Sequence, residues 1–256
     1  MTEGATAADA RRPGSLRASS VSRSFSGVQA LDDVTLEVRR HEVVGLIGSN
    51  GAGKSTLVNL LTGFDFPDGG TVELEGHDIS GWSPSRRGRA GLARTFQHSR
   101  SFRDLSVREN VEVAALGCGA RSRAARERAD RLLALLGLTS HENAPAGTLA
   151  HGDERRLGLA RALATEPRYV LLDEPAAGLP ESEIPGLAAA VRSVRDDHDA
   201  GVLLIDHNMA LVMDVCDRIH VLDHGRTLAE GTPTEIRANA EVTSAYLGES
   251  AVAAGV

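Results

Sequence analysis

The chain has 256 residues, of which 41% are hydrophobic and 25% charged, a composition typical of a globular protein and not of a disordered or fibrous one. Its formal net charge of −7 excludes a general attraction to nucleic acid or anionic lipid, so any polyanion must be bound at a local site. The two cysteines, Cys118 and Cys216, fit neither a disulfide framework nor a metal-binding spacing, which predicts a reducing compartment and no thiol chemistry.

The two ends of the chain are expected to be tails. Residues 1–14 lack the apolar segment of a signal peptide and predict a disordered tail, and 249–256 predict a second one. One domain is expected over 15–248. Its longest uncharged stretches, such as 43–53, are shorter than the ~18 apolar residues of a membrane span, so the chain is not expected to cross a bilayer.

The first predicted elements are β-strands. Apolar and polar residues alternate over 34–39 and again over 71–75, which indicates antiparallel structure near the N-terminus. Between them, the apolar run 43–47 predicts a buried strand, and 56–61 predict a helix that ends near Gly63.

The segment between this strand and this helix contains the only lysine of the chain, since the 28 basic residues are 27 arginines and Lys54. A compact ammonium fits inside a tight loop where the broad fork of arginine does not. The segment satisfies G-x-x-x-x-G-K-[ST] and predicts a phosphate loop, in which backbone N–H groups bind phosphates, Lys54 reaches the β- and γ-phosphates and Ser55 binds Mg²⁺. Its residues are Gly48, Ser49, Asn50, Gly51, Ala52, Gly53, Lys54, Ser55 and Thr56.

The next region, about 97–149, is predicted to be helical. Apolar residues recur along one helix face before Gly137, which is expected to end the helix. They are Ala125, Ala129, Leu132, Leu133 and Leu136. The charges over 121–131 are of both signs and indicate a solvated face instead of a nucleic-acid contact.

From residue 169 onward, strands and helices alternate. The apolar run 169–172 is followed by Asp173 and Glu174, and the run 201–205 by Asp206 and His207. Helices are expected over 187–195, 209–216 and 231–247. The strands therefore predict a parallel core sheet flanked by helices.

Polar side chains at these strand ends are expected to meet, because ligands of such sheets bind outside the carboxyl ends of the strands. We predict that Asp173 holds Mg²⁺, through water, and that Glu174 polarises the attacking water. His207 can contact the γ-phosphate, although on the residues alone a structural histidine is the more common alternative.

With the phosphate loop and the strand ends in this order, the chain resembles the ATP-binding subunit of ABC transporters over about 16–248. Phe25 matches the aromatic residue that stacks on adenine, with a core phenylalanine as an equal alternative. Gln97 resembles the glutamine of the Q-loop, which links the metal site to the membrane subunit. The segment 149–154 matches the family signature, which implies that His151, Gly152 and Asp153 contact ATP on the opposite subunit.

This resemblance implies an α/β fold, a P-loop NTPase of ABC type with a mixed core sheet flanked by helices. An N-terminal antiparallel β subdomain and a helical insertion at about 98–150 belong to it, with ATP and Mg²⁺ as cofactors. The insertion, with Phe102, would contact a membrane subunit. His151 and Asp153 depart from the usual signature, and Pro180 stands where the family's D-loop has Asp, which predicts an impaired partner site and an asymmetric dimer.

Four segments, 61–64, 94–98, 152–157 and 245–248, narrow the resemblance to the branched-chain amino-acid uptake branch. It implies two membrane-spanning permease subunits, a second and different ABC ATPase, an extracytoplasmic solute-binding protein and no nucleic acid. The chain would lie peripherally on the cytoplasmic face of the cell membrane. The solutes would be hydrophobic amino acids or, as in relatives, amides, urea or aromatic acids.

Other functions of a phosphate loop are less well supported. A GTPase needs an N-K-x-D element, which a chain with one lysine in its phosphate loop does not have. A P-loop kinase would lack the segments around Gln97, 149–154 and His207. A soluble ABC ATPase acting on ribosomes or DNA remains the main alternative, although one domain with one short insertion favours transport.

Overall fold

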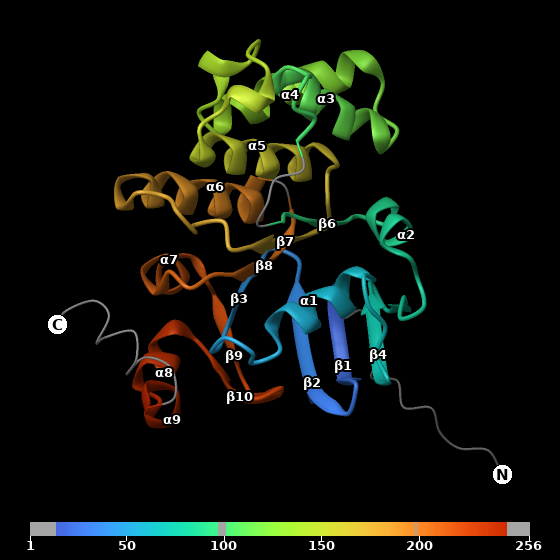
Figure 1. Cartoon of the computed structure of the whole chain (residues 1–256), viewed down its shortest axis with the longest axis vertical. Helices are drawn as coiled ribbons and strands as arrows, with labels where there is room; N and C mark the ends of the chain where they lie inside the picture. Colours follow the sequence, from blue (N-terminus) through green and yellow to red (C-terminus); the bar gives the residue numbers. More distant parts are fainter. Residues whose placement is uncertain (1–13, 97–100, 198, 245–256) are drawn as a thin grey trace.

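The computed structural model describes residues 14–96, 101–197 and 199–244 and contains two β-sheets (Figure 1). The smaller, antiparallel sheet has the strand order β2-β1-β4-β5. Its strands are β1 (Ser15–Phe25), β2 (Val28–Arg39), β4 (Gly69–Leu74) and β5 (His77–Asp78). It is the antiparallel structure that the alternation over 34–39 and 71–75 predicts.

The larger sheet has the order β10-β9-β3-β8-β7-β6 and is parallel except at β10, which pairs antiparallel with β9. Its strands are β3 (Val43–Ile47), β6 (Leu92–Arg94), β7 (Tyr169–Asp173), β8 (Gly201–Ile205), β9 (Arg218–Asp223) and β10 (Arg226–Gly231). The predicted mixed sheet is thereby confirmed. β3 and β8 are buried along their whole lengths because elements cover both faces of the sheet.

The two faces of β3 pack against different parts of the molecule. Val44 and Leu46 pack in one core with the antiparallel sheet and α1 (Lys54–Thr62), whereas Val43 and Ile47 pack in the other core with the helices. The remaining helices of the core region are α2 (Pro84–Arg89), α6 (Ile184–Asp197) and α7 (Met209–Val215), and a 3-10 turn, Glu181–Glu183, precedes α6.

Three helices, α3 (Val107–Gly117), α4 (Ser122–Leu135) and α5 (His151–Ala164), pack on one another at the upper end of the molecule in Figure 1. Two 3-10 turns, Thr139–His141 and Ala146–Thr148, join α4 to α5. The apolar face predicted for α4 is buried, and Gly137 adopts a positive φ just after the helix. No helix within the described ranges is long and apolar enough to cross a membrane.

The prediction of one helix over 231–247 is wrong within the described residues. Gly231 ends β10, and two short helices follow, α8 (Pro233–Ala238) and α9 (Ala240–Val242). Asn239 is extended between them, and its Oδ1 accepts hydrogen bonds from the N–H groups of Glu241 and Val242. An asparagine in this cap position starts a new helix and breaks the first. Residues 1–13, 245–248 and the predicted tail 249–256 lie outside the described chain.

Candidate nucleotide-binding site

The predicted phosphate loop, 48–53, connects β3 to α1 and is held between β2 and β9. At Gly48, with φ 154°, an added Cβ would lie 2.2 Å from the backbone oxygen of Leu222 on β9. At Gly53, the N-cap of α1, a Cβ would lie 2.6 Å from the backbone oxygen of Ala30 on β2. Only glycine fits these contacts, so the loop has a fixed path with its backbone next to the N-terminus of α1.

Lys54 lies across this loop. Its Nζ donates hydrogen bonds to the backbone oxygens of Gly48 at 2.7 Å and of Ser49 at 2.9 Å. Burial lowers the pKa of Lys54, and the negative charge of Glu174 acts in the opposite direction. The lysine is therefore placed between the phosphate loop and the acidic end of β7.

Asp173, the last residue of β7, is held by the neighbouring strand β6. Its Oδ2 accepts a hydrogen bond from Arg94 Nη2 at 2.8 Å, and its N–H donates to Thr95 Oγ1 at 3.1 Å. Arg94 also donates to Asn59 Oδ1 on α1 at 2.8 Å. In the sequence, 94–98 indicates only the family resemblance, and the contact by which Arg94 ties α1 to the predicted metal ligand was not predicted.

Glu174 and His207 come together from β7 and β8. Glu174 Oε1 lies 3.4 Å from His207 Nε2, and the Glu174 N–H donates to the backbone oxygen of Ile205 at 2.7 Å. Beside them, the buried Asp206 accepts hydrogen bonds at 2.8 Å from the N–H groups of Ala176 and Asn208. Burial raises the pKa of Asp206. This carboxylate therefore fixes the backbone on both sides of the site.

The predicted signature residues His151, Gly152 and Asp153 open α5. The Asp153 carboxylate accepts a hydrogen bond from Arg156 at 3.1 Å and lies 3.7 Å from His141 Nε2. Its charge is thus partly balanced within the chain. The D-loop residue Pro180 precedes the turn Glu181–Glu183.

The predicted site residues at the periphery are described in part. Phe25, at the end of β1, is 44% exposed and lies 4.8 Å below the guanidinium of Arg23, so it is a surface residue and not a core phenylalanine. Gln97 lies outside the described residues. Phe102 is also exposed, and the guanidinium of Arg161 lies 5.2 Å from its ring centre.

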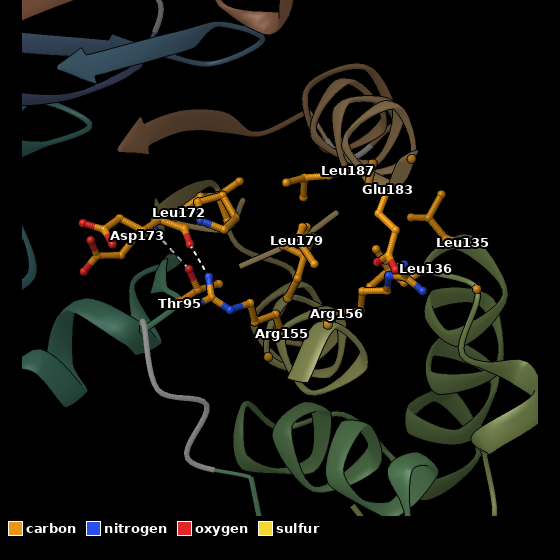
Figure 2. A pocket seen from close by; sticks show the side chains of 18 of the residues that line it. Thr95, Leu135, Leu136, Arg155, Arg156, Leu172, Asp173, Leu179, Glu183 and Leu187 are labelled. Carbon is orange, nitrogen blue, oxygen red and sulfur yellow. Dashed lines mark hydrogen bonds and ion pairs between the residues drawn. The ribbon is translucent and has the colours of Figure 1, made fainter. Parts of the chain in front are cut away.

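Two hollows adjoin these residues. A cavity of about 350 Å³ lies between α5, α6 and the end of β7 (Figure 2). Its wall is largely apolar, from Leu136, Leu172 and Leu187 among others, and Arg155 and Arg156 of α5 also line it. A groove of about 320 Å³ between α3, α5 and β6 is lined by several exposed or half-buried residues, among them Thr95, Phe96, Ala114, Cys118 and Arg161.

The side chains suit a magnesium ion that arrives with a nucleotide. Within the described ranges, no group of three or more His, Cys, Asp or Glu side chains is arranged to hold a metal. Mg²⁺ takes most of its ligands from phosphate oxygens and water when it binds with a nucleotide, so the hydroxyl of Ser55 and the carboxylate of Asp173 are donors of the right kind.

Comparison with known proteins agrees with this geometry. The family model described as "ABC transporter" matches residues 31–177, more than half of the chain. The chain belongs to the ABC transporter family of ATPases. A second model, "Branched-chain amino acid ATP-binding cassette transporter", matches residues 226–252.

Relatives of this ABC ATPase include two curated transport proteins. It is 45% identical to the high-affinity branched-chain amino acid transport ATP-binding protein LivG of Salmonella typhimurium, over 88% of this chain and 94% of the relative. It is 42% identical to the corresponding protein BraF of Pseudomonas aeruginosa, over 92% of this chain and 98% of the relative.

The solved structures give the same fold. The ADP conformation of MJ1267, an ATP-binding cassette of an ABC transporter, superposes with a TM-score of 0.82 at 28% identity and covers 93% of this chain and 100% of that one. The predicted ABC fold is confirmed, and the domain is one that binds nucleotide and hydrolyses ATP in a transporter.

Proposed function

We propose that this ABC ATPase is the ATP-hydrolysing subunit of an importer for branched-chain or other hydrophobic amino acids, or related small solutes. The observation that carries the proposal is the 42–45% identity to LivG and BraF over nearly the whole chain. The match of the branched-chain family model to 226–252 supports it. These relatives do not favour the alternative of a soluble ATPase that acts on ribosomes or DNA.

In the proposed site, the N–H groups of 48–56 and Lys54 bind the phosphates of ATP, and Phe25 stacks on the adenine. Ser55, Asp173 and Gln97 hold Mg²⁺, with Asp173 acting through water. Bound there, Mg²⁺ neutralises phosphate charge. Two contacts support these assignments. Lys54 donates to the phosphate loop at Gly48, and Arg94 donates to the carboxylate of Asp173.

Glu174 is the proposed group that polarises the attacking water, and His207 the group that contacts the γ-phosphate. Phosphoryl transfer depends on a well-oriented nucleophile more than on covalent chemistry, so the position of the Glu174 carboxylate matters most. The 3.4 Å approach of His207 to this carboxylate supports a shared role.

The second half of each site comes from another subunit in this proposal. His151, Gly152 and Asp153, at the N-terminus of α5, contact the ATP held by a second, different ABC ATPase. The contacts of Asp153 with Arg156 and His141 reduce the repulsion that its carboxylate would exert on phosphate. ATP binds the closed pair more tightly than the open one and thereby drives closure.

The membrane partners are proposed to be two permease subunits, with an extracytoplasmic solute-binding protein delivering the solute and no nucleic acid involved. The chain then lies on the cytoplasmic face of the membrane. The groove between α3, α5 and β6 supports a protein contact there, because the exposed Phe96 lines it and the exposed Phe102 lies against Arg161 of its wall.

Affinity capture of tagged Glu174→Gln protein from its native membranes with ATP tests the proposal. Glutamine keeps the size of the side chain but does not take a proton, so we expect ATP to stay bound and the closed complex to persist. Two multi-span proteins and a second ATPase should co-purify, and Lys54→Ala protein should lose the ATP-dependent part of this capture. Recovery of ribosomal or DNA-bound proteins instead would contradict the importer.

A further inference from the structure

Arg155, one helical turn after His151 in α5, makes a contact with Glu174 that the proposed function does not use. Its Nη1 donates to the backbone oxygen of Glu174 at 2.6 Å, and its Nε donates to His151 Nε2 at 3.3 Å. Figure 2 shows Arg155 beside Thr95 and Asp173, whereas Arg156 lies toward Glu183. The Arg155 guanidinium thus links α5 to the residue that directly follows β7.

The backbone of Glu174 needs such a contact. Its φ of 49° lies in the left-handed region, which a residue with a Cβ adopts only when its surroundings hold it there. The N–H of Glu174 is fixed by Ile205 of β8, on the core side, and its carbonyl by Arg155, on the side of α5.

Close packing does not replace this contact, because the cavity of about 350 Å³ separates α5 from α6 next to Glu174. In a closely packed interior, neighbouring atoms on every side keep a backbone segment in place. Here the Arg155 guanidinium lines the cavity, and its hydrogen bond keeps the backbone of Glu174 in place.

We propose that Arg155 is a positioning residue for ATP hydrolysis: by holding the Glu174 carbonyl, it keeps the left-handed backbone that aims the Glu174 carboxylate at the attacking water. The inference rests on the proposed role of Glu174. It also joins the signature end of α5 to the hydrolytic group of the same chain.

Arg155→Met and Arg155→Lys test the proposal in the assembled transporter. Methionine keeps an apolar stem but has no donor, and we expect the kcat of ATP hydrolysis to fall about tenfold or more while KM for ATP stays the same, since misplacing a reacting group is costly. Lysine has a donor long enough to reach the carbonyl and should keep most of the activity.

Arg128→Met is the matched control. Arg128 also donates to a backbone oxygen at 2.6 Å, that of Ala164. It thereby joins α4 to the C-terminal end of α5, the opposite end from the contact with Glu174. We expect its loss to lower the melting temperature without changing kcat. A decrease in kcat as large as that of Arg155→Met would show a general loosening of the helices and overturn the proposal.

A double variant separates positioning from structural support. If Arg155 acts through Glu174, then Arg155→Met should cause no further loss of residual hydrolysis in Glu174→Gln protein, because interacting residues are not additive. Multiplying losses would overturn the proposal, as would an Arg155→Lys variant as slow as Arg155→Met.

The single variants distinguish this inference from the proposed function. If Glu174→Gln protein hydrolyses ATP at the parent rate, both the proposed role of Glu174 and this inference are wrong. If Glu174→Gln protein is slow but Arg155→Met protein hydrolyses ATP at the parent rate, only this inference is wrong.

Discussion

Lys54 shows how one side chain is fixed by the loop that it serves. Its ammonium lies between two backbone oxygens at 2.7 and 2.9 Å, and burial lowers its pKa. The carbonyls hold the charge close to the N–H groups that would face a phosphate. All other basic residues of the chain are arginines, which agrees with a site that takes a compact ammonium and not a guanidinium.

Lys54→Arg is therefore expected to weaken ATP binding although it conserves the charge. The planar guanidinium is broader than the ammonium that donates to the oxygens of Gly48 and Ser49, and we expect a loss of about tenfold or more in affinity. Titration with a fluorescent ATP analogue measures it, with the melting temperature as a check on folding. Binding equal to that of the parent would contradict the size argument.

The sequence predicts the residues of this site better than it predicts their partners. Gly48 to Thr56 follow from the motif and Asp173 from strand order, because those signals are local, whereas the role of His207 follows from the family resemblance. The hydrogen bonds of Arg94 to Asp173 and of Arg155 to Glu174 join residues 79 and 19 positions apart. No periodicity or motif encodes such a contact, since it depends on how the strands and helices pack.

Among the elements, buried strands were the most predictable. The predicted runs 43–47, 169–172 and 201–205 lie in β3, β7 and β8, because continuous apolar residues bounded by polar ones fit a strand covered on both faces. The prediction of one helix over 231–247 was wrong because the composition suits a helix, but Asn239 ends α8 and caps a second helix, α9. The short α2 was not predicted, although Pro84 at its start is a known signal.

The end of α1 depends on a buried arginine. Arg87, on α2, donates hydrogen bonds to the backbone oxygens of Leu60 and Leu61 at the end of α1, and also to those of Trp82 and Ser80. Burial lowers its pKa to about 10, so it remains charged at neutral pH. A cation at this end of α1 is also favourable for the helix dipole.

Arg87→Met should consequently destabilise the protein by roughly 2 to 4 kcal/mol, because four backbone carbonyl groups lose a charged donor and buried guanidinium packing is lost. Urea unfolding monitored by circular dichroism measures this cost. Arg89→Met, on the exposed side of the same helix, is the control and should change the free energy of unfolding by less than about 0.5 kcal/mol. Similar effects of the two substitutions would show that the contacts of Arg87 do not support α1.

At the scale of the whole molecule, the two sheets hold the candidate site at one edge and the helices α3, α4 and α5 form one end (Figure 1). The groove between α3, α5 and β6 is lined by Thr95, whose Oγ1 accepts a hydrogen bond from the N–H of Asp173. A protein that binds in this groove would therefore contact the strand next to the predicted metal ligand.

Cys118 tests whether the groove is covered in the assembled importer. It is exposed at the end of α3 and lines the groove, so a maleimide should modify it readily in the isolated subunit and more slowly in the complex. Cys216 is an internal control, because it is buried, its pKa is raised by burial, and it should not react until the protein unfolds. Equal rates at Cys118 in both forms would place the membrane partner elsewhere.

The position of the one lysine also decides how the assembly can be mapped chemically. Reagents that join ε-amines would address Lys54 alone, and that amine lies inside the phosphate loop, where bound ATP would cover it. Lysine-to-lysine crosslinking would thus leave every subunit interface of this protein unmarked, whatever its partners are. Crosslinkers directed at carboxylates or arginines suit a chain whose charge comes from 35 acidic and 27 arginine side chains.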